Sequence, residues 1–450
     1  MYQKMLSCWL VLALLSCQKF LEVKPDRKEQ IPATLSDAAA LLNNTQTMNT
    51  GTPGVGEVAS DNIYVHAENW NALSDPTSRN AYIWGDDVFN ESERNDWALP
   101  YQTILYANTA LETLEGLSQG EKANPQWAQL KGAALFFRAF SFYGLAQVFC
   151  RPYDPATADS DLGLPLRLTA SVTEPLSRAS VRQTYAQINK DLETAATLLE
   201  IAPPYKTQPS RPAAYALLAR TALVMGDYRG AGNYADSTLR LYNSLLDYNT
   251  LNEAVPNPLP RFNAEVIFHA QLFGRSILSA SNANIDTVLY RSYEGDDLRR
   301  TLFFSPNNNG GVSFRGSYIG SSNHFGGLAT DEVYLIRAES RARTGDAAGA
   351  MADLNSLLQH RYRKGSFMPR TAATATEALE EVLIERRKQL LYRGLRWMDL
   401  RRLNQESQRA ITLYRYLDNQ VYSLPPRDLR YVFLIPNKVV YLSSIIQNPR

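Results

Sequence analysis

Two segments of the sequence repeat the pattern of a helical hairpin at a fixed offset. Residues 215–239 and 334–358 each contain a helix, a Gly-Asp step and a second helix, and the offset between them, from Tyr215 to Tyr334, is 119 positions. In each copy the glycine is typical of a residue that ends a helix, and the aspartate fits the N-cap of the next one. This is the pattern of tetratricopeptide-like hairpins, although the two copies are not contiguous. The repeat therefore predicts a helical scaffold with a long excursion between its parts.

Apolar spacing and capping boxes predict further helices. Ser180 with Gln183, and Thr374 with Glu377, have the spacing of a reciprocal N-terminal cap. The segment 128–149 is apolar almost all round, which predicts a central buried helix. The other predicted helices begin near Thr34 and Trp97. We expect a mainly α fold, with a tetratricopeptide-like scaffold, long irregular loop excursions and a few short strands.

The predicted excursions cover about residues 50–96 and 250–329. Both are rich in Gly, Asn, Ser, Pro and aromatic residues and show weak helical periodicity. Short β-like runs occur at residues 265–268 and 312–314. Because loops on a rigid scaffold frequently carry function, these excursions are where we expect a binding surface.

The N-terminus has the pattern of an export signal. A short apolar run over residues 9–15 is too short to span a bilayer and ends in Leu14-Leu15-Ser16-Cys17, which resembles a bacterial lipoprotein box. We expect a lipoprotein signal peptide at 1–16, a lipidated tether at 17–33 with the acyl chains on Cys17, and a single domain at 34–450. The alternative is an ordinary secretory signal. Lipidation of Cys17 explains an exported chain in which Cys150 has no disulfide partner, since Cys8 is removed with the signal.

Charge and motifs exclude several classes of function. With 46 basic and 45 acidic residues the net charge is +1, so no broad positive field predicts nucleic-acid binding. The four histidines are scattered, and no phosphate loop, dinucleotide fingerprint or nucleophile elbow occurs. We therefore predict no metal, no cofactor and no catalytic residue. Arginines in the segment 385–402 are expected to pair with carboxylates within the helical scaffold.

A glycosidase or lyase is the enzymatic alternative. It would need two carboxylates flanking a cleft. The sequence offers three adjacent acidic pairs, Asp86-Asp87, Asp296-Asp297 and Glu380-Glu381. Surface charge explains them more simply, and the helix dipole alone accounts for Glu380-Glu381, which lies in the first turns of a predicted helix.

Aromatic residues in the excursions are the candidate ligand contacts. An aromatic ring can stack on the C–H face of a sugar while Asn and Arg bind its hydroxyl groups. The alternative is that such rings, Tyr82 and Trp84 above all, pin the loops to the scaffold. We expect the mutation of Trp70 and Tyr318 to weaken glycan binding without unfolding the protein. The full candidate set is Trp70, Arg79, Asn80, Tyr82, Trp84, Tyr290, Tyr293 and Tyr318.

Several of these segments together resemble the SusD/RagB family of surface nutrient-binding lipoproteins. They keep the order of the family and span nearly the whole chain: Leu15-Ser16-Cys17, 20–25, Trp97 with Tyr101 and Asn108, 137–140, 334–339, Gly345-Asp346, 385–387, 394–402, Ile435-Pro436 and 447–449. The resemblance implies four tetratricopeptide-like helix pairs decorated by loops that form the ligand surface. It also implies a partner, a SusC-like TonB-dependent transporter of the outer membrane.

The predicted function is a non-catalytic binding lipoprotein, anchored in the outer membrane and facing the cell exterior. It would capture an oligosaccharide and deliver it to the transporter. A peptide cargo or a pure protein-interaction scaffold are the alternatives, and a secreted glycosidase or lyase is a weaker one. The sequence Gln18-Lys19 after Cys17 lacks an acidic run of the kind linked to surface export, so the membrane face follows from the resemblance alone.

Overall fold

A computed structural model describes residues 32–89, 95–175, 177–308 and 310–450 of the chain. The predicted signal peptide, the lipidation site Cys17 and nearly all of the predicted tether lie outside the described residues. The helices are α2 (Leu35–Leu42), α3 (Thr45–Met48), α4 (Val55–Ala59), α5 (Ala67–Ala72), α6 (Pro76–Tyr82), α7 (Ala98–Gly116), α8 (Gln119–Lys122), α9 (Pro125–Phe149), α10 (Val181–Leu198), α11 (Arg211–Val224), α12 (Tyr228–Leu241), α13 (Thr287–Arg291), α14 (Arg299–Leu302), α15 (Thr330–Arg343), α16 (Ala347–Leu358), α17 (Ala375–Gln389), α18 (Arg396–Leu403) and α19 (Asn437–Ser443).

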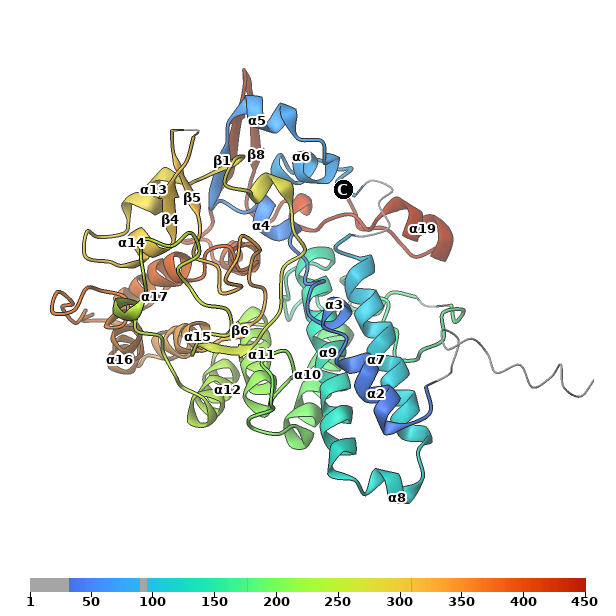
Figure 1. The fold of residues 1–450 in the computed structure, drawn as a ribbon. Helices are drawn as coiled ribbons and strands as arrows, with labels where there is room; N and C mark the ends of the chain where they lie inside the picture. Colours follow the sequence, from blue (N-terminus) through green and yellow to red (C-terminus); the bar gives the residue numbers. More distant parts are fainter. Residues whose placement is uncertain (1–31, 90–94, 176, 309) are drawn as a thin grey trace, which may run out of the picture.

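The long helices pack in chain order to form the scaffold. Contacts run from α7 to α9, then through α10, α11 and α12 to α15, α16 and α17. In Figure 1 these helices occupy the lower part of the molecule, and the loop excursions lie above them. The prediction of a mainly α, tetratricopeptide-like scaffold is confirmed.

The predicted repeat corresponds to the helix pairs α11–α12 and α15–α16. Gly226 and Gly345 adopt φ values of 76° and 95°, the left-handed conformation that glycine reaches without strain. Asp227 and Asp346 then accept the backbone N–H of the third residue of the next helix. Although the second excursion separates the pairs in sequence, α12 packs directly against α15. The two hairpins thus form one continuous scaffold.

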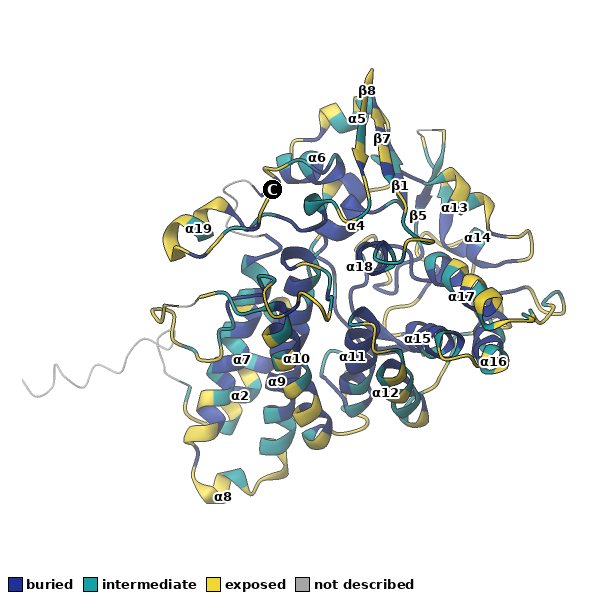
Figure 2. Cartoon of the chain, turned by 180° about the vertical axis from the view of Figure 1, so that it is seen from behind, coloured by how far each residue is buried: buried dark blue, intermediate teal, exposed yellow. Residues whose placement is uncertain are grey.

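Helix α9 is the buried centre of this scaffold, as predicted. It is the one helix among the described residues that is long and apolar enough to cross a membrane, and its apolar window is entirely buried within the protein. Figure 2 shows α9 and α11 as largely buried, in contrast to the exposed α8 and α19. A helix that is apolar on all sides is the expected core element of a large helical protein.

Short strands tie the excursions together. Antiparallel pairing joins β1 (Ile63–Val65) of the first excursion to β3 (Ala283–Ile285) of the second. The other pairs are β2 (Val266–Phe268) with β6 (Leu328–Ala329), β4 (Phe304–Pro306) with β5 (Val312–Phe314), and β7 (Leu413–Leu417) with β8 (Gln420–Leu424). β2 and β5 match the predicted β-like runs. The β1–β3 pairing brings the two excursions into one surface layer.

A buried network of charges fixes the second excursion to the scaffold. Arg393 forms a bidentate ion pair with Asp331 of α15, with nitrogen–oxygen distances of 2.9 and 2.7 Å. The hydroxyl of Tyr318, from the excursion, lies 3.1 Å from Asp331 and also contacts Glu265. Glu265 in turn pairs with Arg361 at 2.6 Å. Because a buried charge is costly unless it is paired, this network favours one docked position of the excursion.

A second buried cluster links α15 to α18. Glu339 accepts both terminal nitrogens of Arg402, at 2.6 and 2.8 Å, and also binds Arg343 at 2.8 Å. Burial alone would raise the pKa of Glu339, but the two guanidinium groups outweigh it and lower the pKa from its ordinary 4.5 to about 2. The predicted pairing of the arginines in 385–402 with carboxylates is confirmed here for Arg402.

We predict that this cluster contributes to acid unfolding. The folded-state pKa of Glu339 lies below its ordinary value, so the stabilisation is fully present above about pH 4.5 and is lost as the pH falls towards 2. In Glu339→Gln the unfolding free energy should therefore depend less steeply on pH over this interval. Urea titration at a series of pH values measures this dependence. Glu380→Gln, which changes a half-exposed carboxylate paired with Arg409, is the matched control. Equal slopes for the two variants would contradict the assignment.

Candidate functional site

An open groove lies where the two excursions meet the β7–β8 hairpin. Its volume is about 670 Å³, and it is lined by β1 and the start of α5, by the N-terminus of α13, and by β7. We call it the tyrosine groove; the side chains that define it here are Tyr64, His66, Asp286, Arg387, Tyr414 and Tyr416. Figure 1 shows α5, β1 and β8 together at the top of the molecule.

One wall of the tyrosine groove comes from the first excursion. In β1, Ile63 and Val65 point into the core while Tyr64 is half-buried, as expected for a strand with alternating faces. The ring of the exposed His66 meets Tyr64 edge to face, with centroids 5.6 Å apart. This wall therefore presents an aromatic pair to the groove.

The opposite wall comes from β7. Leu413, Arg415 and Leu417 are buried, and the intervening Tyr414 and Tyr416 are 53% and 71% exposed. The two tyrosine rings are 6.4 Å apart and inclined by 23°. Exposed aromatic side chains on a rigid strand, within a groove, form a platform on which a planar or ring-shaped ligand can stack.

Charged groups form the floor. Arg387 binds the backbone carbonyl of Asp61 at 2.8 Å and lies 3.7 Å from the carboxylate of Asp286. Asp61 also receives two hydrogen bonds from Arg396, at 2.7 and 2.8 Å. Burial would raise the pKa of Asp61, but Arg396 and Arg387 outweigh it and hold the pKa far below its ordinary value. The floor thus offers fixed charges and hydrogen-bonding groups below the rings.

Arg415 anchors the tyrosine wall to the first excursion. Its buried guanidinium donates to the carbonyls of Tyr82, at 3.2 Å, and of Ile63, at 3.3 Å, and also to that of Ser60. It stacks over the ring of Tyr82 at 4.3 Å and over that of Trp84 at 5.0 Å. Burial lowers the pKa of Arg415, and contacts with carbonyls and π faces hold the cation in place.

Four of the predicted ligand contacts are buried, and of these four only Tyr82 lines the tyrosine groove. Tyr82, Trp84, Tyr293 and Tyr318 are at most 2% exposed. The hydroxyl of Tyr82 accepts a hydrogen bond from the amide of Val65, and the indole of Trp84 donates one to the carbonyl of Ala59. Both side chains thus anchor the loop, as the alternative interpretation of the sequence expects. Tyr293 donates to the carbonyl of Lys388 at 2.7 Å. Replacing Tyr318, which belongs to the buried charge network, would destabilise the fold, contrary to the expectation from sequence.

The remaining predicted contacts are half-buried and lie outside the tyrosine groove. The indole of Trp70 donates to the backbone carbonyl of Arg79 at 3.1 Å, which ties α5 to α6. Asn80 donates to the carbonyl of Asp87. Tyr290 packs edge to face on Phe304, with centroids 5.4 Å apart. Their role in ligand binding stays a prediction.

Tyr414 and Tyr416 lie outside the two predicted excursions and are not among the predicted ligand contacts. In the segment Leu413-Tyr414-Arg415-Tyr416-Leu417 every second residue is a tyrosine, and Asp418-Asn419 follows it. Alternation of this kind before two turn-forming residues is typical of a β-hairpin. Asp418 adopts a φ of 49°, as such a turn requires. This signal predicts exposed tyrosines on one face of a strand.

The acidic pairs weighed for catalysis are each engaged in an ion pair. Asp86 binds Arg450, and Asp297 is buried against Arg299. Glu380 binds Arg409 and Glu381 binds Arg370. None of these pairs lines the tyrosine groove, whose own carboxylates are Asp61 and Asp286.

Comparison with known families agrees with this architecture. The model described as "Starch-binding associating with outer membrane" matches residues 19–223, and the SusD family model matches residues 329–438. The two matches lie on either side of α12 and the second excursion, which neither match covers. The chain belongs to the SusD/RagB family, a family of carbohydrate-binding proteins.

Solved structures of low sequence identity share the fold. A SusD superfamily protein from Bacteroides thetaiotaomicron is 21% identical, with a TM-score of 0.75 over 93% of this chain and 100% of that one. A putative sugar binding protein from Bacteroides vulgatus is 23% identical, with a TM-score of 0.74 over 94% and 99%. A laminarin binding SusD-like protein is 18% identical, with a TM-score of 0.66 over 93% and 99%. No curated protein sequence matches the chain.

We predict that Arg415→Lys loosens the tyrosine wall. A lysine ammonium cannot reproduce the planar fork that reaches three carbonyls and two aromatic faces, so the unfolding free energy should fall by roughly 2 kcal/mol. Hydrogen exchange should accelerate in β7 and β8 more than in the scaffold helices. Arg240→Lys, at a 77% exposed position on α12, is the control. Unchanged exchange in the hairpin would show that Arg415 does not anchor it.

Proposed function

We propose that the protein is a non-catalytic, lipid-anchored carbohydrate-binding protein on the outer face of the outer membrane. It captures an oligosaccharide in the tyrosine groove and delivers it to a SusC-like TonB-dependent transporter. The observation that carries the proposal is the pair of exposed, nearly parallel rings of Tyr414 and Tyr416 above a charged floor. Sugar binding needs both components, an apolar ring face and fixed polar groups.

The geometry of the groove suits an extended saccharide. Its volume of about 670 Å³ exceeds that of a single sugar, and both β1 and β7 line it. Tyr64 and His66 face it from one side and the β7 tyrosines from the other. The resemblance to a laminarin binding SusD-like protein and to a putative sugar binding protein supports the ligand class.

The electrostatics of the floor support binding without hydrolysis. A glycosidase requires one carboxyl group that stays protonated near neutral pH and a second that is ionised. Arg396 and Arg387 keep the pKa of Asp61 far below its ordinary value, so it holds no proton to donate. Asp286 caps α13 by accepting the amide of Leu289 at 2.8 Å, a structural task.

Membrane attachment and the transporter partner follow from the sequence and the family. The lipoprotein box at Cys17 supplies an anchor, and several acyl chains on one residue give durable attachment. Delivery requires no nucleotide site in this chain, because the transporter couples translocation to its own energy source. Ligand contacts shared by the two proteins would favour a closed complex through differential affinity.

We predict that Tyr414→Ala combined with Tyr416→Ala weakens polysaccharide binding by roughly tenfold or more. Each exposed ring contributes roughly 1 kcal/mol of stacking, and both are lost together. Affinity electrophoresis of the full-length chain in detergent, in gels that contain laminarin, starch or other soluble polysaccharides, measures the change in retardation. The melting temperature should be unchanged, since both side chains point to solvent.

The control for this experiment is Tyr441→Ala. Tyr441 is 85% exposed on α19 and does not line the groove. Equal retardation of the double variant and the parent protein would remove the tyrosine groove as the saccharide site. Release of reducing ends on long incubation would favour the glycosidase, and the absence of retardation by every polymer would favour a peptide cargo or a scaffold.

We further predict that Cys17→Ser releases the protein from the membrane. Serine cannot form the thioether that carries the lipid, so the variant should move from the outer-membrane fraction to a soluble fraction. Fractionation of cells followed by immunoblotting measures the ratio, and Cys150→Ser, at a buried cysteine, is the control. Membrane retention of Cys17→Ser would point to anchoring by a different segment or by the partner.

A further inference from the structure

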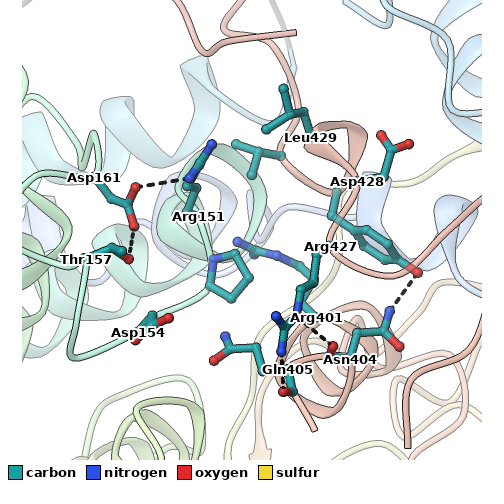
Figure 3. Close-up of a pocket in the computed structure, with 13 residues that line it drawn as sticks. Arg151, Asp154, Thr157, Asp161, Arg401, Asn404, Gln405, Arg427, Asp428 and Leu429 are labelled. Carbon is teal, nitrogen blue, oxygen red and sulfur yellow. Dashed lines mark hydrogen bonds and ion pairs between the residues drawn. The ribbon is translucent and has the colours of Figure 1, made fainter. Parts of the chain in front are cut away.

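A second pocket lies apart from the tyrosine groove, at the junction of three chain segments. Its volume is about 300 Å³, and it is enclosed by the loop after α9, the C-terminal end of α18 and residues 427–432. Figure 3 shows three arginine side chains, Arg151, Arg401 and Arg427, extending into it from these segments. We call it the arginine pocket. It shares no lining residue with the tyrosine groove.

Arg401 is a buried cation with no carboxylate partner in the described part of the chain. It is 4% exposed, and its terminal nitrogens donate to the carbonyls of Gln147 and Cys150 at the end of α9. Its Nε has no hydrogen-bond partner. Burial lowers the pKa of Arg401, and the groups that oppose this shift are Tyr185, Cys150 and Tyr143, none of which is an acid ionised at neutral pH. The carbonyls carry partial charges only, so a positive charge remains beside the pocket.

Arg427 adds a second cation that is held by backbone groups. Its guanidinium donates to the carbonyls of Asn404 and Gln405, at 3.4 and 2.6 Å, and no ion pair involving it is found among the described residues. Its backbone adopts a φ of 62°, a conformation that is costly for a residue with a side chain. Strained residues of this kind are concentrated at functional sites. The fold thus holds Arg427 over the pocket at a cost in backbone energy.

Two of the three carboxylates that line the pocket, those of Asp161 and Asp428, are paired with an arginine. Asp161 pairs with Arg151 at 3.4 Å and also accepts the hydroxyl of Thr157 at 2.6 Å. Asp428 pairs with Arg430 at 2.8 Å, outside the pocket lining. Asp154 accepts the amide of Ala156 within its own turn. Figure 3 shows Asp428 directed away from the centre, where Arg401 and Arg427 lie together. Among the described residues, two cations of the pocket, Arg401 and Arg427, therefore have no ion pair, against one carboxylate, that of Asp154.

The size and lining of the pocket select among anions. A free carboxylate or a small inorganic anion would fill a minor part of 300 Å³, which is near the lower limit for pockets that bury an organic ligand. Pro152, Leu429 and Val432 supply apolar surface, and Asn404 and Gln405 supply polar groups. Apolar surface beside a cationic centre suits a ring that carries a carboxylate.

We propose that the arginine pocket is a second saccharide site, one that binds a uronic acid residue through its carboxylate. The guanidinium groups of Arg427 and Arg401 attract the carboxylate, and the apolar side chains contact the sugar ring. This site shares no lining residue with the tyrosine groove, so its test is separate from that of the oligosaccharide capture proposed there. An acidic polysaccharide could then be held at two points on one molecule, which raises its avidity.

The test uses saturation-transfer NMR on the full-length chain in detergent, with sodium D-glucuronate as the probe. D-glucose reports on the sugar ring without the charge, and sodium acetate reports on the charge without the ring. We expect glucuronate to bind at least tenfold more tightly than either. Arg427→Gln, at an exposed position, should weaken glucuronate binding about tenfold, as the loss of one charge-assisted contact requires. Arg240→Gln on α12 removes a distant positive charge and is the matched control.

Four outcomes would overturn the proposal. Equal binding of glucuronate and glucose would show that the charge is not recognised, and equal binding of glucuronate and acetate would show an anion site with no preference for a sugar. Unchanged glucuronate affinity in Arg427→Gln would place the binding elsewhere. Loss of glucuronate binding in Tyr414→Ala with Tyr416→Ala, and its retention in Arg427→Gln, would assign the acidic sugar to the tyrosine groove.

Discussion

The buried ion pair between Arg393 and Asp331 is the contact on which the layer of loop excursions depends. Asp331 lies in the first turn of α15, and through Tyr318 and Glu265 it connects the scaffold to the second excursion. β3 of that excursion then pairs with β1 of the first, and β1 forms a wall of the tyrosine groove. Charges in such a network are costly to separate, because breaking one pair leaves the other charge buried and alone. The buried ion pair therefore helps to fix the position of β1, which forms one wall of the tyrosine groove.

The scaffold could be predicted from sequence because its signals are local. A capping box or a Gly-Asp step needs a few consecutive residues, and each one marked a helix boundary that the structure contains, as at Ser180, Thr374 and Asp346. Pairing of β1 with β3 could not be predicted in this way. It joins residues more than two hundred positions apart, and neither strand exceeds three residues. Three residues carry too little periodicity to define a partner or a register.

The candidate site was predicted in the same layer of the molecule, but of the predicted residues only Tyr82 lines the tyrosine groove. Tyrosine among Asn, Ser and Gly looks exposed in a sequence, yet its hydroxyl allows it to be buried wherever an acceptor is near, as the partners of Tyr293 and Tyr318 demonstrate. Exposure follows from the alternation of a strand, which sets Tyr414 and Tyr416 outward because Arg415 points inward. The role of Arg401 in the arginine pocket could not be predicted for a related reason, because a sequence does not reveal whether an arginine has a carboxylate partner.

The direct packing of α12 on α15 has a consequence for how such proteins diversify. The chain leaves the scaffold at Leu241 and returns at Thr330, and the helices on either side are neighbours. An excursion with adjacent ends behaves as a closed loop, whose entropic cost rises by only about 0.6 kcal/mol for each doubling of length. Insertions and deletions between these two points are therefore thermodynamically cheap for the scaffold. Loop length can drift over evolutionary time, with new ligand surfaces as the result, while the helical hairpins and their caps stay in place.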